Sequence, residues 1–294
     1  MMSPVKIWFL ASRPKTLPAA IAPVIIGTAM AYDQHQFHLV SALVCLFCAI
    51  LIQITANLAN DYFDGKRGTD TPSRLGPQRV TQAGLVSHRQ MKSAIALTIG
   101  LTLIGGLYLV IRGGWPILII GLLSILFSLL YTAGPFPLAY LGLGDVFVFI
   151  FFGLVAVSGT FYVQTLSLNP IVVMMGILPG LLSVAILTVN NLRDIDEDRL
   201  HNKKTLAVRF GRTFAQIEYG FTLLVAAIVP FIYGRAHPEH QFMMGLCALQ
   251  GVLISRFLIK TVFTYKDPRQ LNPMLGRTGA LLFLYSVTFS ISLM

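Results

Sequence analysis

The sequence predicts an all-α integral membrane protein in which nine transmembrane helices surround a central cavity. The 294-residue chain is 55% hydrophobic and only 12% charged, and its mean hydropathy of +0.73 lies far above that of a soluble globular domain. Short polar breaks divide it into apolar runs of roughly 17 to 25 residues, the length that an α-helix needs to cross a bilayer. The Lys and Arg residues gather in alternate breaks, as they do in polytopic membrane proteins.

The nine predicted spans cover residues 15–32, 38–59, 93–111, 115–132, 142–163, 170–190, 213–234, 240–260 and 276–294. The first is expected to be retained, because no small-residue cleavage site follows a short apolar stretch at the start of the chain. Residues 1–294 are expected to form one domain.

The distribution of positive charge predicts the orientation of the spans. If the N-terminus is cytoplasmic, the inside segments are 1–14, 60–92, 133–141, 191–212 and 261–275. These segments and the adjoining span ends hold 20 of the 22 Lys and Arg residues, and only Arg112 and Arg235 fall outside. The positive-inside rule therefore predicts a cytoplasmic N-terminus and a C-terminus on the other side. The formal net charge of +10 is mostly this topology signal, so it indicates a lipid bilayer and no nucleic acid as partner.

A first polar motif, NLANDYFDGKRGTDTPSRLGPQR, runs from Asn57 to Arg79 at the inner end of the second span. Asn57, Asp61 and Asp64 have the i, i+4, i+7 spacing of one helix face, so three oxygen ligands are expected to point the same way. A Gly- and Pro-rich loop with several cations follows, and flexible backbone with positive charge suits an anionic ligand. Its cations are Lys66, Arg67, Arg74 and Arg79.

The position of these acids at a helix C-terminus needs an explanation. The negative end of the helix dipole disfavours Asp61 and Asp64 there, so positive charge is expected beside them. Lys66 and Arg67 supply it as simple ion pairs in one interpretation. In the other, a bound Mg²⁺ supplies it, held by carboxylates and phosphate oxygens.

A second polar motif, NNLRDIDEDRLHNKKTLAVRFGR, begins at Asn190 at the inner end of the sixth span. Asn190 (or Asn191), Asp194 and Asp198 repeat the spacing of one acidic helix face, and Lys203 and Lys204 follow, with Arg209 and Arg212 beyond them. Seven of the twelve acids lie in the two motifs: Asp61, Asp64, Asp70, Asp194, Asp196, Glu197 and Asp198. Two acidic faces that meet across a cavity fit a metal-bound diphosphate.

Other charged and sulfur-containing residues allow two interpretations each. Arg13 is either a positive-inside anchor or a phosphate ligand on the same rim as the acids. Asp145 is either a functional ionisable group in a span or a favourable charge at a helix N-terminus. Cys45 and Cys48 have metal-type spacing but lack the further ligands of a zinc site, so we expect them to be packing residues.

The two motifs together resemble the Asp-rich motifs of the UbiA superfamily of intramembrane prenyltransferases. Further similarity lies in ASRPKTLPAAIAPVIIGTA from Ala11, GLGDVFVFIFFG from Gly142 and GTFYVQ from Gly159. Within the superfamily the sequence is most similar to the 1,4-dihydroxy-2-naphthoate polyprenyltransferases of menaquinone biosynthesis. The resemblance covers about residues 11–215. Asp196 and Glu197 exceed the Asp-x-x-x-Asp minimum of the second motif and leave its choice of ligands open.

The resemblance implies a Mg²⁺-dependent enzyme in the bacterial inner membrane, with its site near the cytoplasmic face and with a polyprenyl diphosphate and an aromatic acceptor as substrates. It implies Asn57, Asp61, Asp64, Asn190, Asp194 and Asp198 as metal ligands, the four aspartates being catalytic in this sense. It likewise implies Arg13, Lys66, Arg74, Arg79, Lys203 and Lys204 as diphosphate-binding residues. Metal and cations together stabilise a diphosphate leaving group, so no Ser, Cys or Lys nucleophile is required.

Three alternatives compete with this interpretation. Within the superfamily, the acceptor is 4-hydroxybenzoate or another aromatic or lipid compound in the alternative case. A secondary transporter is the alternative outside it, but transporters place their ionisable residues near the bilayer midplane, whereas both acidic motifs lie at span ends. A structural protein whose charged loops only set topology would need neither motif for activity.

Overall fold

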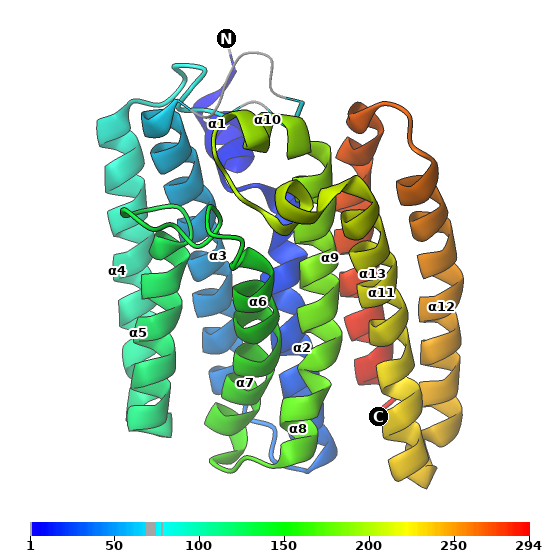
Figure 1. The fold of residues 1–294 in the computed structure, drawn as a ribbon. Helices are drawn as coiled ribbons and strands as arrows, with labels where there is room; N and C mark the ends of the chain where they lie inside the picture. The colour runs from blue at the N-terminus through cyan, green and yellow to red at the C-terminus, as the bar shows by residue number, and fades with distance from the viewer. Residues whose placement is uncertain (1, 69–74, 78) are drawn as a thin grey trace.

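The computed structural model describes residues 2–68, 75–77 and 79–294. Figure 1 shows an elongated bundle of helices that run side by side, with the N-terminus at one end and the C-terminus at the other. Helices α1 (Pro4–Ala11) and α10 (Ile195–Leu200) lie at the N-terminal end of this bundle. We call this end the polar end, because both acidic motifs lie there.

The bundle consists of long apolar helices. They are α2 (Leu17–Asp33), α3 (Leu39–Arg67), α4 (His88–Gly113), α5 (Trp115–Leu130), α6 (Gly144–Phe149) with η2 (Ile150–Val155) and α7 (Ala156–Thr165), α8 (Pro170–Met175) with α9 (Ile177–Arg193), α11 (Leu206–Ala236), α12 (Gln241–Thr264) and α13 (Asn272–Ile291). Three short 3-10 turns, η1 (Pro14–Thr16), η3 (Pro238–His240) and η4 (Pro268–Leu271), join some of them.

Each predicted span coincides with a helical segment of the structure, although several helices extend beyond the predicted bounds. In the part of the chain that the structure describes, eight helical segments are long and apolar enough to cross a membrane. The fourth predicted span, 115–132, forms the shorter apolar helix α5 of 16 residues. Helix α3 continues without a break through Asp61 and Asp64 to Arg67, as the spacing of the first motif predicts.

The first span begins after a sharp break in the chain that the sequence did not predict. Arg13 has a left-handed backbone (φ 49°), and Pro14 follows it at the start of η1. This turn separates α1 from α2, so the N-terminal residues form a helix of their own.

The centre of the bundle is held by close contact between helices. Gly153 in the π-helical turn η2 lies against α9, where an added Cβ would come within 2.5 Å of the Gly176 carbonyl oxygen. In membranes small residues let helix backbones approach in this way. Helix α11 is broken at Gly211, whose φ of 89° is a left-handed conformation that favours glycine.

Candidate active site

A cavity of about 530 Å³ opens inside the bundle below the polar end. Along α3 its lining runs from Asn60 to Cys45, a rise of about 22 Å at ~1.5 Å per residue. The polar lining is concentrated at one end and includes Arg13, Gln53, Asn57, Asn60, Arg79, Tyr131, Asn190, Asn191 and Lys203. Below these residues the walls are mostly apolar, with a few Ser and Thr side chains among them. The cavity therefore suits a ligand with an anionic head and a long hydrocarbon tail.

The apolar part of the cavity reaches the outer surface of the bundle. Leu107 on α4 and Leu118 and Leu122 on α5 line the cavity and are also exposed. An apolar tail in the cavity can therefore extend past these helices toward lipid.

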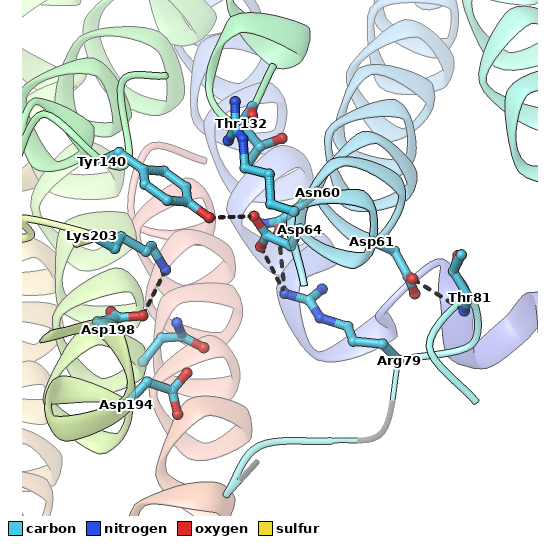
Figure 2. A network of polar contacts seen from close by, with 12 residues as sticks. Asn60, Asp61, Asp64, Arg79, Thr81, Thr132, Tyr140, Asp194, Asp198 and Lys203 are labelled. Atoms are coloured by element: carbon cyan, nitrogen blue, oxygen red, sulfur yellow. Dashed lines mark hydrogen bonds and ion pairs between the residues drawn. The ribbon is translucent and has the colours of Figure 1, made fainter. Parts of the chain in front are cut away.

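Asp61 is hydrogen-bonded to the loop that joins α3 and α4. Its two carboxylate oxygens accept hydrogen bonds from the backbone amides of Val80 and Thr81, at 3.1 and 3.2 Å. The carboxylate is buried, and charge-assisted bonds to backbone amides stabilise it there. This arrangement brings the loop over α3 and places Arg79 at the polar end of the cavity (Figure 2).

Asp64 lies one turn further along α3 and is buried. It accepts a hydrogen bond from the hydroxyl of Tyr140 at 3.1 Å and forms an ion pair with Arg79 at 3.5 Å. Arg79 also donates to the side-chain oxygen of Asn60 at 3.0 Å. The acid and the guanidinium are both buried, so each charge depends on the other for its stability.

Asn57 contributes its amide group to a polar cluster below these ion pairs. Its Nδ2 donates to the Ser12 carbonyl oxygen at 2.9 Å and to the Thr16 hydroxyl at 3.0 Å. Its Oδ1 accepts from Gln53 at 3.4 Å. These contacts tie α3 to the turn that follows α1.

The second acidic motif carries its own cations. Helix α9 ends at Arg193, and the chain turns at Asp194 before α10 begins. Arg193 is fully buried and bonds Asp194 through both Nε and Nη2, at 2.6 Å each. Lys203 pairs with Asp198 at 3.1 Å. Asp194 and Asp198 are thus each neutralised by a cation from the second motif.

The two motifs meet around Lys203. Figure 2 shows the Asp198 and Lys203 pair facing Asp64 and Tyr140 across the polar end. Burial lowers the pKa of Lys203. The nearby carboxylates of Asp198 and Asp64, one from each motif, raise this pKa by more than burial lowers it, so the net shift is upward. A protonated lysine therefore lies between the motifs and lines the cavity.

The donor set fits a divalent cation together with a diphosphate. Asp198 Oδ2 is buried and has no hydrogen-bond partner among the described residues, so it is available as a metal ligand. Burial raises the pKa of Asp198, and Lys203 opposes this shift. No group of three His, Cys, Asp or Glu side chains in residues 2–68, 75–77 and 79–294 is close enough to hold a metal ion by itself. Phosphate oxygens would have to complete the coordination, as is usual for Mg²⁺.

The structure separates the predicted cations by position. Arg13, Arg79 and Lys203 line the cavity, whereas Lys66 and Lys204 are exposed. Arg74, like Asp70, lies outside the described residues. Arg67, expected to pair with the acids, instead donates to the carbonyl oxygens of Thr132 and Gly134 at 2.6 and 2.7 Å.

The acids of the second motif are separated in the same way. Asp194 and Asp198 are buried at the polar end, whereas Asp196 is exposed and pairs with Arg212 at the surface. The extra acidity of the motif therefore includes at least one surface ion pair, of a kind that contributes little to stability.

Several polar residues of the site were not predicted. Gln53 and Asn60 share one stripe of α3 with Asp64, at ~100° per residue, and Asp61 lies beside it. The helical spacing in the sequence could therefore have identified Asn60. Tyr131 and Tyr140 come from the segment between α5 and α6, and no local pattern marks them. Gln53, Asn60 and Tyr131 line the cavity, and Tyr140 contacts Asp64.

Comparisons with known proteins identify the family of this chain. Residues 20–287 match the model of the UbiA prenyltransferase family. The 1,4-dihydroxy-2-naphthoate octaprenyltransferase of Escherichia coli K12 is 40% identical over 283 residues, which cover 94% of this chain and 91% of that protein. The protein of the same name from Mycobacterium tuberculosis is 36% identical, with coverage of 95% and 94%.

Solved structures share the fold at low sequence identity. A UbiA homologue from Aeropyrum pernix in its apo form has a TM-score of 0.69 at 15% identity, with full coverage of both chains. A UbiA homologue from Archaeoglobus fulgidus, bound to DMAPP and Mg²⁺, has a TM-score of 0.66 at 14% identity and covers 97% of this chain and 99% of that one. The family match over most of the chain and the near-full-length relatives agree with both acidic motifs at one cavity: the chain belongs to the UbiA prenyltransferase family.

Proposed function

We propose that this protein is a 1,4-dihydroxy-2-naphthoate polyprenyltransferase of menaquinone biosynthesis. The observation that carries the proposal is that two acidic motifs from distant parts of the chain face the same polar end of a deep apolar cavity. Near-full-length relatives named 1,4-dihydroxy-2-naphthoate octaprenyltransferase, at 32 to 40% identity, support the acceptor. Residues 1–294 act as one domain in this proposal.

The polar end would hold Mg²⁺ together with the diphosphate of the prenyl donor. The residues that would supply the metal ligands are Asn57, Asp61, Asp64, Asn190, Asp194 and Asp198. When bound, Mg²⁺ supplies positive charge to the diphosphate oxygens. UbiA homologues from Archaeoglobus fulgidus bound to DMAPP or GPP together with Mg²⁺ support this assignment.

The ion pairs of the site prepare it for the diphosphate. Arg79 and Lys203 neutralise Asp64 and Asp198. When the diphosphate binds, these two cations turn to its oxygens, and the carboxylates become available for metal. The buried cations then stabilise the negative charge that develops as the leaving group departs.

The reaction joins an allylic carbon to the acceptor ring. The bond between C1 of the prenyl chain and the diphosphate oxygen breaks, and its electron pair leaves with the diphosphate. The ring carbon that bears the carboxylate forms the new carbon–carbon bond. That carboxylate departs as CO₂, and the electron pair of its bond restores the aromatic ring, which gives the demethylmenaquinone skeleton. The apolar walls exclude water, which would otherwise capture the allylic cation.

In this proposal the polar end lies at the cytoplasmic face of the bacterial inner membrane. The alternate clustering of Lys and Arg supports a cytoplasmic N-terminus, and α1 and α10 lie together at that end of the bundle. The C-terminus then lies on the other side of the membrane.

An acceptor screen with the purified protein tests the proposal. Polyprenyl diphosphate is supplied with either carboxyl-labelled 1,4-dihydroxy-2-naphthoate or 4-hydroxybenzoate, with and without EDTA. We expect prenyl transfer and release of labelled CO₂ only with the naphthoate, and loss of both with EDTA. Transfer to 4-hydroxybenzoate alone would show that the acceptor is not the naphthoate. Metal uptake into proteoliposomes without any prenyl transfer would show that the protein is a transporter and not a prenyltransferase.

A further inference from the structure

Three phenylalanine rings form a cluster on one wall of the cavity. Phe127 on α5 and Phe147 on α6 have ring centroids 4.7 Å apart, and Phe127 and the Phe151 ring in η2 are 5.2 Å apart. Phe147 and Phe151 lie nearly parallel, with an interplanar angle of 2° at 6.1 Å. All three line the cavity. We call them the phenylalanine wall.

The phenylalanine wall lies directly below the polar end. Phe127 is one helical turn, about 6 Å, below Tyr131, whose hydroxyl is close to Gly144 at the start of α6. Phe147 is three residues further along α6 than Gly144. Tyr131 and Lys203 both line the polar end, so these rings form the first apolar layer beneath the diphosphate-binding groups.

The rings are not needed to fill the buried core of the bundle. All three are only partly buried, and none of them belongs to the core clusters formed by the described residues. Neighbouring Phe152, by contrast, packs against the main core. The π-helical turn that begins at Ile150 changes the direction of the side chains in this segment, and such turns are frequent at functional sites.

The prenyl donor places its reacting carbon at this layer. Its diphosphate is held by the polar end, and its tail occupies the apolar cavity, so C1 lies at the boundary between the two. Once the C1–oxygen bond breaks, the positive charge is shared by C1 and C3 of the allylic group. A cation within about 6 Å of an aromatic face is attracted by the electron density of the ring, most strongly where water is excluded.

We propose that Phe127, Phe147 and Phe151 stabilise the allylic cation through their aromatic faces, in addition to the stabilisation of the leaving group by Arg79, Lys203 and Mg²⁺. This inference rests on the proposed function, because it requires an allylic diphosphate as substrate. The wall holds the charge until the acceptor ring forms the carbon–carbon bond, and it forms no bond to the substrate itself.

Stepwise fluorination of Phe147 tests this inference without changing the shape of the ring. Phenylalanine, 4-fluoro-, 3,5-difluoro- and 3,4,5-trifluorophenylalanine are incorporated at position 147, and the same series is made at Phe127. Each fluorine withdraws electron density from the ring face. We expect log kcat to fall in steps and to reach about a tenfold loss for the trifluoro variant. The Kd of an unreactive thiolo-diphosphate analogue of the donor is expected to stay the same, because the cation forms only during the reaction.

Phe221 provides the control position, because its side chain is exposed on α11 and does not belong to the cavity lining. The same series there is expected to leave kcat unchanged. If kcat were equal across the series at Phe147 and Phe127 in an active enzyme, the inference would be wrong and the proposed function would stand. If the unmodified protein transferred no prenyl group to any acceptor, the proposed function itself would fail.

Discussion

The carboxylate of Asp61 accepts a hydrogen bond from the backbone amide of Val80 at 3.1 Å. The two residues are nineteen positions apart, so this bond fixes where the α3–α4 loop lies. The neighbouring amide of Thr81 donates to the other carboxylate oxygen. Asp61 therefore has a structural role in addition to the metal-binding role that we propose for it.

Replacement of Asp61 by Asn is expected to loosen this loop. The Asn side chain has one acceptor oxygen, so its NH₂ group would face a backbone N–H donor. Loss of a hydrogen bond to a charged group costs about 1.5 to 3 kcal/mol, and we expect amide hydrogen exchange across residues 79–87 to become at least about tenfold faster. Asp64→Asn is the matched control, because Asp64 contacts the side chains of Tyr140 and Arg79, whereas Asp61 accepts from the backbone amides of Val80 and Thr81. Equal exchange in both variants would contradict the anchoring role.

Replacement of Lys203 by Met is expected to destabilise the protein far more than the same change at Lys204. Lys203 neutralises Asp198 and lies near Asp64, and the loss of one partner of a buried pair costs about 3 to 5 kcal/mol. The Lys204 side chain is exposed, so its loss is expected to cost little. Thermal unfolding in detergent measures the difference, and added Mg²⁺ is expected to recover part of it in Lys203→Met by neutralising the carboxylates. Similar melting temperatures for the two variants would show that Lys203 is not the charge that holds the motifs together.

The sequence predicted the regular part of this molecule well. The apolar runs predict the helices, and the i, i+4, i+7 spacing predicts that α3 continues through Asp64. The convergence of the two acidic motifs followed from their shared position at span ends. These features depend on helical period and bilayer thickness, which are properties of the local sequence.

The partners of individual side chains could not be predicted in the same way. Asp61 turns to a loop that follows nineteen residues later, and Tyr140 reaches Asp64 from the turn before α6. The left-handed turn at Arg13 likewise has no local signal beyond Pro14. Each of these contacts is set by tertiary packing, so the spacing of the motifs identified the polar end but not which cation holds which acid.

The two acids Asp196 and Asp198 are expected to differ in their contribution to metal binding. Asp198 is buried at the polar end with an oxygen that has no partner in the described residues, and Asp196 is exposed beside Arg212. Asp198→Asn is expected to raise the Mg²⁺ concentration for half-maximal activity by on the order of tenfold or more, whereas Asp196→Asn is expected to leave it unchanged. Titration of the EDTA-treated enzyme with Mg²⁺ measures both. A larger effect from Asp196→Asn would mean that the exposed Asp196, and not Asp198, binds the metal.

The length of prenyl chain that the cavity accepts is expected to depend on a glycine in its deep part. Gly106 on α4 lines the cavity, and an added Cβ there would meet no atom within 4 Å. The Cβ of Gly106→Leu therefore displaces no neighbour, and we expect the rest of the side chain to occupy space that the distal isoprene units need. We expect activity with a long polyprenyl diphosphate to fall severalfold and activity with geranyl diphosphate, whose short tail ends higher in the cavity, to change little.

Gly100 on the same helix provides the control for this change. It also has open space around it, but it is not among the residues that line the cavity, so Gly100→Leu faces outward and is expected to leave the ratio of the two activities unchanged. Both variants add the same side chain to α4, so their effects on helix stability are comparable. Competition between long and short donors in one reaction gives the ratio directly. If Gly106→Leu left it unchanged, the tail would have to follow another path through the bundle, away from the wall that α4 contributes.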